Sequence, residues 1–183
     1  MTTAEDIEQQ IAALVLSGDV DTLRELRDRL QARRTRRNAH RVTRYMYDPV
    51  GWARDCIRWE EDEGLTAYQQ DIVGALPRER RVAVRGPHGL GKTGLASITV
   101  LWFASTREAA GIDWKVIMTA SAWRHLSVYL LPEIHKWAKR IRWEVLGRPP
   151  YSERTELLAL MLKLAHGAAS AVASNKAELI RQL

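Results

Sequence analysis

The sequence predicts an α/β fold, a parallel sheet with flanking helices, preceded by an α-helical N-terminal segment. Two short apolar stretches typical of strands, residues 81–85 and 115–120, are each followed by a helical pattern. A strand–helix–strand–helix order favours a parallel sheet. Before residue 48 the apolar side chains recur at helical spacing. We therefore divide the chain into a helical, basic N-terminal segment, residues 1–47, and an α/β part, residues 48–183.

Composition excludes several classes of protein. The 183 residues are 46% hydrophobic and include seven tryptophans, a content that low-complexity disordered chains do not have. No apolar run approaches the roughly 20 residues that a membrane span needs, so no membrane partner is expected. The start of the chain lacks the pattern of a signal peptide, and the single cysteine, Cys56, cannot form an internal disulfide. Both observations favour a cytoplasmic location.

The charge is basic, and arginine dominates it. Lysine and arginine number 28 against 22 acidic residues, which gives a formal net charge of +6. This excess of positive charge suggests an anionic partner, with nucleic acid as the first candidate. The alternative is that the charge only keeps the protein soluble. Between Arg29 and Arg44 there are seven arginines and no acidic residue. The run is interpreted as a phosphate-binding arm, a contact to an acidic partner, or a solvated helix end. Its candidate contact residues are Arg33, Arg34, Arg36 and Arg37.

Helical periodicity predicts the other helices. Two are expected in the N-terminal segment, separated by Gly18 and Asp19. A helix after residue 48 is expected to bury Trp52, Cys56 and Trp59 on one stripe and to end in the acidic stretch that follows. Cys56 is interpreted as a buried small hydrophobe rather than a nucleophile. Further helices are expected over residues 67–76, 93–103 and 123–137.

Alternating leucines near the end of the chain predict a hairpin. The alternation covers residues 158–164, the turn falls at His166 and Gly167, and residues 168–174 return as the partner strand. A helix is the alternative, because leucine and alanine both favour one.

Residues 86–93 carry the strongest functional signal. Their sequence fits the phosphate-binding pattern G-x-x-x-x-G-K-[ST], the Walker A loop, at every fixed position. Glycines permit the close approach that lets backbone N–H groups point at phosphate oxygens. Lys92 is expected to neutralise the β- and γ-phosphates, and the Thr93 hydroxyl to bind Mg²⁺. The alternative is a glycine-rich turn that binds nothing. The candidate nucleotide ligands in this loop are Gly86, Pro87, His88, Gly89, Leu90, Gly91, Lys92 and Thr93.

Two weaker candidates lie outside this loop. The Gln69 amide can donate and accept at once, so it can read the edge of adenine, and Tyr68 can cover the ring face. Both are otherwise ordinary helix surface. Arg124, after the second expected strand, is a candidate contact to DNA or a partner, or else a solvated helix residue. The five histidines show no metal-ligand spacing.

Four segments together resemble a known family. In chain order they are Leu65–Gln69, Val82–Thr93, Leu101–Phe103 and Val116–Ser121. They resemble the N-terminal ATPase domain of the large terminase subunit of tailed bacteriophages, the motor that packages DNA into procapsids. The resemblance covers roughly residues 48–174.

The resemblance implies a P-loop NTPase-type sheet, with ATP and Mg²⁺ as cofactors and DNA translocation as the function of the full-length protein. It implies that Tyr68 and Gln69 form the adenine-recognition motif. Double-stranded DNA, a small terminase subunit and a portal are the implied partners. A homo-oligomeric ring in the cytoplasm of the infected bacterial host is the implied setting.

The sequence also departs from the family. A working motor needs an apolar strand that ends in Asp-Glu, the Walker B element, and the only such step here, Asp62-Glu63, precedes the phosphate loop in a polar run. The family's nuclease residues are not found either. His88 is the only candidate for the basic residue that family loops often carry. We therefore expect residues 48–183 to be a partial ATPase domain with an incomplete sheet, in which Lys92 binds phosphate but hydrolysis does not occur.

Two other functions remain open at this point. One is a helicase-like P-loop ATPase that shares the glutamine motif. The other is a non-catalytic DNA-binding or assembly module that uses the arginine run and keeps only a vestigial nucleotide loop.

Overall fold

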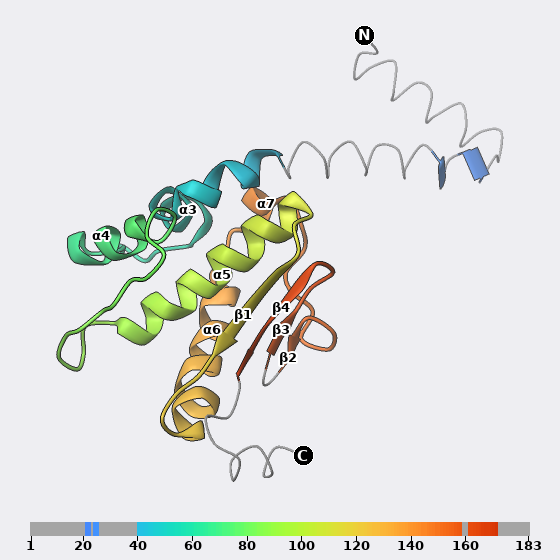
Figure 1. The fold of residues 1–183 in the computed structure, drawn as a ribbon. Coiled ribbons are helices and arrows are strands. Elements are labelled where there is room, and N and C mark those ends of the chain that lie inside the picture. The colour runs from blue at the N-terminus through green and yellow to red at the C-terminus, as the bar shows by residue number, and fades with distance from the viewer. Residues whose placement is uncertain (1–20, 23, 26–39, 159–160, 172–183) are drawn as a thin grey trace. The chain divides into compact units, whose positions relative to one another are not determined.

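The computed structural model describes residues 21–22, 24–25, 40–158 and 161–171 (Figure 1). The chain divides into two compact units, Met1–Arg37 and Asn38–Leu183. The helices expected around Gly18 and most of the arginine run, including Arg33, Arg34, Arg36 and Arg37, lie outside the described residues. Among the helices that are described, none is long and apolar enough to cross a membrane.

The second unit is a mixed α/β fold with a small four-stranded sheet in the order β1-β4-β3-β2 (Figure 1). The α/β prediction is thus confirmed, but the sheet is mixed, since only the β1–β4 pair is parallel. Its helical elements are η1 (Arg44–Tyr47), α3 (Pro49–Cys56), α4 (Ala67–Ala75), α5 (Lys92–Ala110), η2 (His125–Leu130), α6 (Leu131–Lys139) and α7 (Trp143–Leu146). Its strands are β1 (Trp114–Met118), β2 (Leu157–Leu158), β3 (Met161–Lys163) and β4 (Gly167–Ala171).

The C-terminal hairpin is confirmed, and the alternative of a helix there is wrong. Strand β3 pairs antiparallel with β4, Leu162 opposite Ala169. The leucine alternation does not form one long strand, however. It is divided into β2 and β3, which pair with each other through Leu158 and Met161. Strand β4 then pairs in parallel with β1, so the hairpin joins the strand that follows α5 to the rest of the sheet.

The strand expected at residues 81–85 is wrong. These residues are irregular, and Val82 and Val84 are 36% and 45% exposed. Their short apolar run is typical of a strand, but a strand also needs a neighbouring edge that supplies backbone hydrogen bonds. The strand expected at 115–120 does form, as β1, and its ladder partner in the described residues is β4.

The expected helices form with shifted ends. Helix α5 runs further than expected, to Gly111, whose φ of +65° ends the helix in the left-handed region that suits glycine. Helix α3 is shorter than expected, because Ile57 leaves it to bridge Ile141. Trp59 therefore lies outside the helix, and its indole nitrogen donates to the Ala53 carbonyl oxygen at 2.9 Å. The helix expected over 123–137 is continuous through the π-helical turn η2 into α6.

Helix α5 lies at the centre of the core. It runs along β1 and β4 and beside α6, and η1 and α3 pack on it (Figure 1). Trp102 on α5 donates its indole N–H to the Tyr45 carbonyl oxygen at 2.7 Å, which attaches η1 to the helix. Val42 and Tyr45 are buried in the same core. The end of the segment that the sequence assigned to residues 1–47 thus packs with the α/β part.

Glu108 near the end of α5 holds the β3–β4 turn. Its carboxylate accepts hydrogen bonds at 3.1 Å from the Trp114 indole and from the backbone N–H groups of Ala165 and His166. We expect Glu108→Ala to lower the free energy of unfolding by roughly 1–3 kcal/mol, because three donors lose a charged acceptor. Urea unfolding measures this. Glu144→Ala, which removes an exposed carboxylate, is the control and should change stability by under about 0.5 kcal/mol; equal losses would contradict the role of Glu108.

Cys56 is fully buried on α3, as the sequence predicted, and burial raises the pKa of its thiol from the ordinary 9.0 to about 12. We expect the thiol to resist modification in the native protein and to react once denaturant is added. The unfolded chain loses this proton before the folded one does. The stability that the neutral thiol contributes is therefore complete below pH 9.0 and is lost as the pH rises towards 12. Urea unfolding of the unchanged chain should weaken more steeply above pH 9.0 than that of Cys56→Ala.

Candidate functional site

The loop of residues 86–93 leads directly into α5. Gly89 and Gly91 have φ of +85° and +70°, conformations that favour glycine. Gly91 is the N-cap of α5, and within the described residues no side chain caps this helix. The N–H groups of its first turn, beginning at Lys92, are therefore available to an anion. The glycine pattern in the sequence thus corresponds to the backbone geometry that it predicted.

Lys92 folds back over the loop. Its ammonium group donates to the Gly86 carbonyl oxygen at 2.9 Å and to the Pro87 carbonyl oxygen. Two of its three donors are used in this way, and the third remains for a phosphate oxygen. Thr93 is exposed, and its hydroxyl has no hydrogen bond to any described residue. Both side chains that the pattern assigns to phosphate and metal are thus compatible with these ligands.

The start of α4 lies against the loop. The Tyr68 hydroxyl donates to the Leu90 carbonyl oxygen, and the Gln69 amide nitrogen approaches the same oxygen at 3.3 Å. The Gln69 amide oxygen accepts the Thr66 backbone N–H at 3.0 Å in a capping box. Gln69 therefore joins the cap of α4 to the phosphate loop. Adenine recognition by this residue remains a prediction.

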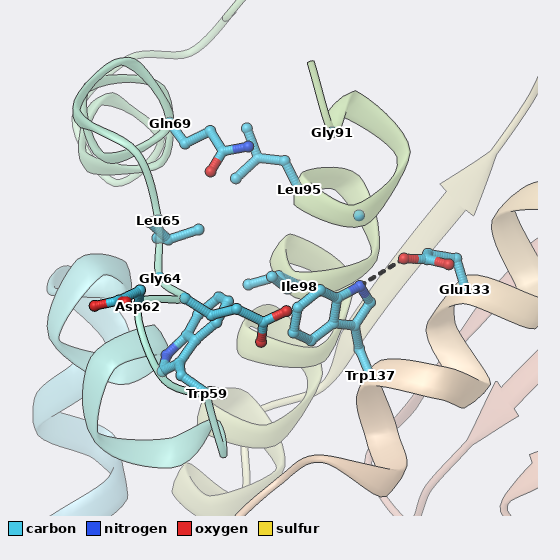
Figure 2. Close-up of a pocket in the computed structure, with 12 residues that line it drawn as sticks. Trp59, Asp62, Gly64, Leu65, Gln69, Gly91, Leu95, Ile98, Glu133 and Trp137 are labelled. Atoms are coloured by element: carbon cyan, nitrogen blue, oxygen red, sulfur yellow. Dashed lines mark hydrogen bonds between the residues drawn. The ribbon is translucent and has the colours of Figure 1, made fainter. Parts of the chain in front are cut away.

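A cleft of about 390 Å³ opens beside Gln69 and Gly91 (Figure 2). Its walls come from the chain segment before α4, the first turns of α5, and α6. Trp59 and Trp137 contact each other there, with ring centroids 5.3 Å apart. The Glu133 carboxylate accepts the Trp137 indole N–H at 2.8 Å, as the dashed line in Figure 2 marks. This hydrogen bond within α6 thus fixes the orientation of the Trp137 ring in the cleft.

Sequence reasoning did not identify this cleft. Glu133 and Trp137 lie on α6, far along the chain from the loop, and no motif marks them. One local signal was present in Gly94 on α5. A Cβ at that position would lie 3.3 Å from the Trp137 indole nitrogen and 3.5 Å from a Glu133 carboxylate oxygen, so glycine permits α6 to approach.

Three carboxylates line the cleft, those of Asp62, Glu63 and Glu133. Arg140 donates to the Glu63 carboxylate, and this hydrogen bond holds the pKa of Glu63 below its ordinary value. In the described part of the chain, no group of three or more histidine, cysteine, aspartate or glutamate side chains is arranged to hold a metal ion.

The structure gathers some predicted site residues and not others. Tyr68, Gln69 and residues 86–93 form one continuous site. Arg124 is exposed at the start of the helical stretch before η2, where it belongs to none of the contacts described above. The chain matches no protein-family model, no curated protein and no solved structure.

Replacing Gly91 by alanine tests the loop geometry. The new Cβ would be strained at φ +70° and would lie 3.0 Å from the Gln69 amide nitrogen. We expect a loss of about 1–2 kcal/mol in the free energy of unfolding. Gly74→Ala in α4 is the control, since space there is ordinary and alanine favours a helix; it should raise stability by about 0.5–1 kcal/mol. Urea unfolding of both variants is the measurement, and a neutral Gly91→Ala would contradict this loop conformation.

Proposed function

We propose that this chain is the N-terminal part of a viral DNA-packaging motor ATPase, the large terminase subunit. In the full-length protein it binds ATP and Mg²⁺ through the loop of residues 86–93 to drive DNA translocation. The observation that carries the proposal is the combination of two left-handed glycines, an uncapped helix N-terminus and Lys92 in one loop. A loop needs these features if its backbone N–H groups are to bind the phosphates of a nucleoside triphosphate.

The proposed ligands of the cofactors follow from this geometry. Backbone N–H groups of the loop and the Lys92 ammonium hold the phosphates, and the Thr93 hydroxyl binds Mg²⁺. Bound Mg²⁺ neutralises charge on the β- and γ-phosphates. Tyr68 and Gln69 stand beside the loop and are proposed to read the adenine.

We propose nucleotide binding without appreciable hydrolysis by this chain alone. A strand that ends in Asp-Glu does not follow the loop anywhere in the 183 residues. Without a carboxylate that activates water and completes the metal site, the phosphate cradle has no catalytic partner. Duplex DNA, a small terminase subunit, a portal and a ring of further copies are the proposed partners, in the cytoplasm of an infected bacterium.

A second candidate is supported by a specific observation. Residues 81–85 form no strand, and Lys92 is bound to the loop's own carbonyl oxygens. Both features favour a non-catalytic DNA-binding or assembly module whose nucleotide loop is vestigial. In that case duplex binding does not depend on Lys92.

Lys92→Ala tests the proposal. We expect it to lower the affinity for MgATP at least about tenfold, because a charged hydrogen bond to phosphate is lost. Calorimetric titration of the chain with MgATP measures this. Lys115→Ala removes an exposed lysine from β1 and should leave the affinity unchanged.

Three outcomes separate the alternatives. MgATP binding that disappears only in Lys92→Ala supports the proposal. No MgATP binding by the unchanged chain, with intact duplex binding, selects the non-catalytic module. Steady phosphate release that Lys92→Ala abolishes would reveal a catalytic carboxylate that the sequence analysis missed.

A further inference from the structure

Arg107 lies at the far end of α5 from the phosphate loop, and no acidic side chain of the described residues pairs with its charge. It lies in the last turn, and its guanidinium stacks on the Phe103 ring at 3.9 Å and on the Trp102 ring at 4.8 Å from their centroids. One nitrogen donates to the Thr106 hydroxyl at 3.0 Å. No carboxylate within residues 40–158 and 161–171 forms an ion pair with it.

This arrangement contrasts with the other stacked cations. Arg140 and Lys136 lie over Trp137, and Arg148 lies over Tyr151, but each of these also pairs with a glutamate. Partly buried charges are normally paired in this way. Partial burial lowers the pKa of Arg107, as expected for a cation removed from water without an anion beside it.

The unused donors of Arg107 are suited to an external anion. A guanidinium has five N–H donors in a planar fork, and here only one is used within the described residues. Stacking on two rings fixes the plane of the fork, so little conformational freedom remains to be lost on binding. Carboxylates and phosphates are the anions that such a fork binds in bidentate geometry.

Tyr47 extends this site onto η1. Its side chain is 79% exposed, and it lies on the same short helical turn as Tyr45, which packs on α5. The Trp102–Tyr45 hydrogen bond fixes η1 against α5 one turn before Arg107. Tyrosine hydroxyls and arginines are both frequent contacts to the phosphates of nucleic acid.

The surrounding sequence favours a polymer of phosphates over a single ion. Arg41 is exposed on the helical turn that leads into η1, and it belongs to the acid-free run from Arg29 to Arg44. We propose that Arg107 and Tyr47 form a docking surface for the phosphodiester backbone of duplex DNA, at the opposite end of α5 from the nucleotide loop. The inference deepens the proposed function, because it names where this domain contacts its DNA.

Removing the charge and the hydroxyl separately tests the surface. We expect Arg107→Ala to weaken binding of a labelled duplex about 5- to 10-fold in fluorescence anisotropy, and to reduce the slope of log K against log salt by about 0.9. Tyr47→Phe removes one hydroxyl from an exposed ring and should weaken binding about threefold. Arg107→Lys keeps the charge but not the fork and should fall between Arg107→Ala and the unchanged chain.

Arg78→Ala is the matched control. It removes an exposed arginine that follows α4 and should leave duplex affinity unchanged. Urea unfolding of each variant identifies a loss due to misfolding. If Arg107→Ala misfolds, Arg107→Lys and Tyr47→Phe decide the result, since Tyr47 contributes little to the core.

The outcomes are distinct from those for the nucleotide loop. The proposal predicts that Arg107→Ala keeps MgATP affinity and that Lys92→Ala keeps duplex affinity. Equal duplex affinities for Arg107→Ala and Arg78→Ala would overturn the surface without affecting the nucleotide proposal. Arg107-dependent binding to anionic lipid vesicles, with no effect on duplex, would also overturn it and would assign the fork to a headgroup phosphate.

Discussion

The burial of helix α5 is the constraint on which the rest of the described structure depends. The helix contacts α3, α6, η1, η2, β1 and β4. Two strands of the small sheet and four helical elements therefore pack against this one helix. Its boundaries are set by two left-handed glycines, Gly91 and Gly111. A four-stranded sheet of this size has little stability of its own, and packing against a long helix supplies the apolar contact that it needs. Whatever moves α5 therefore moves both of its ends.

Both ends of α5 carry groups that are suited to anions. The N-terminus presents backbone N–H groups and Lys92 beside Gln69, and it is suited to the phosphates of a nucleotide. The C-terminal turn carries Arg107 on two aromatic rings, and it is suited to the phosphates of DNA. A helix transmits displacement along its axis with little loss. The arrangement thus offers a direct mechanical route between the proposed nucleotide site and the proposed DNA surface, through a single helix whose side chains are mostly buried or half-buried.

Gln69 illustrates how one side chain serves both fold and site. Its amide oxygen completes the capping box of α4, and its amide nitrogen approaches the Leu90 carbonyl oxygen in the loop. The start of α4 is therefore fixed relative to the phosphate cradle before any ligand binds. Pre-organisation of this kind lowers the entropy that binding must offset. It also leaves the Gln69 oxygen with one remaining lone pair for a base.

The sequence by itself determined the local features of this protein. Turn glycines, most of the helices and the burial of Cys56 all follow from neighbouring residues, and each was predicted. Tertiary structure decided the rest. The apolar run at residues 81–85 predicted a strand, but pairing needs an edge, which no local pattern supplies. The cleft at Trp137 and the stacking of Arg107 on two rings depend on side chains that packing brings together. The local sequence sets the conformational preference of each segment. Which distant side chains a residue contacts is decided only when the whole chain packs.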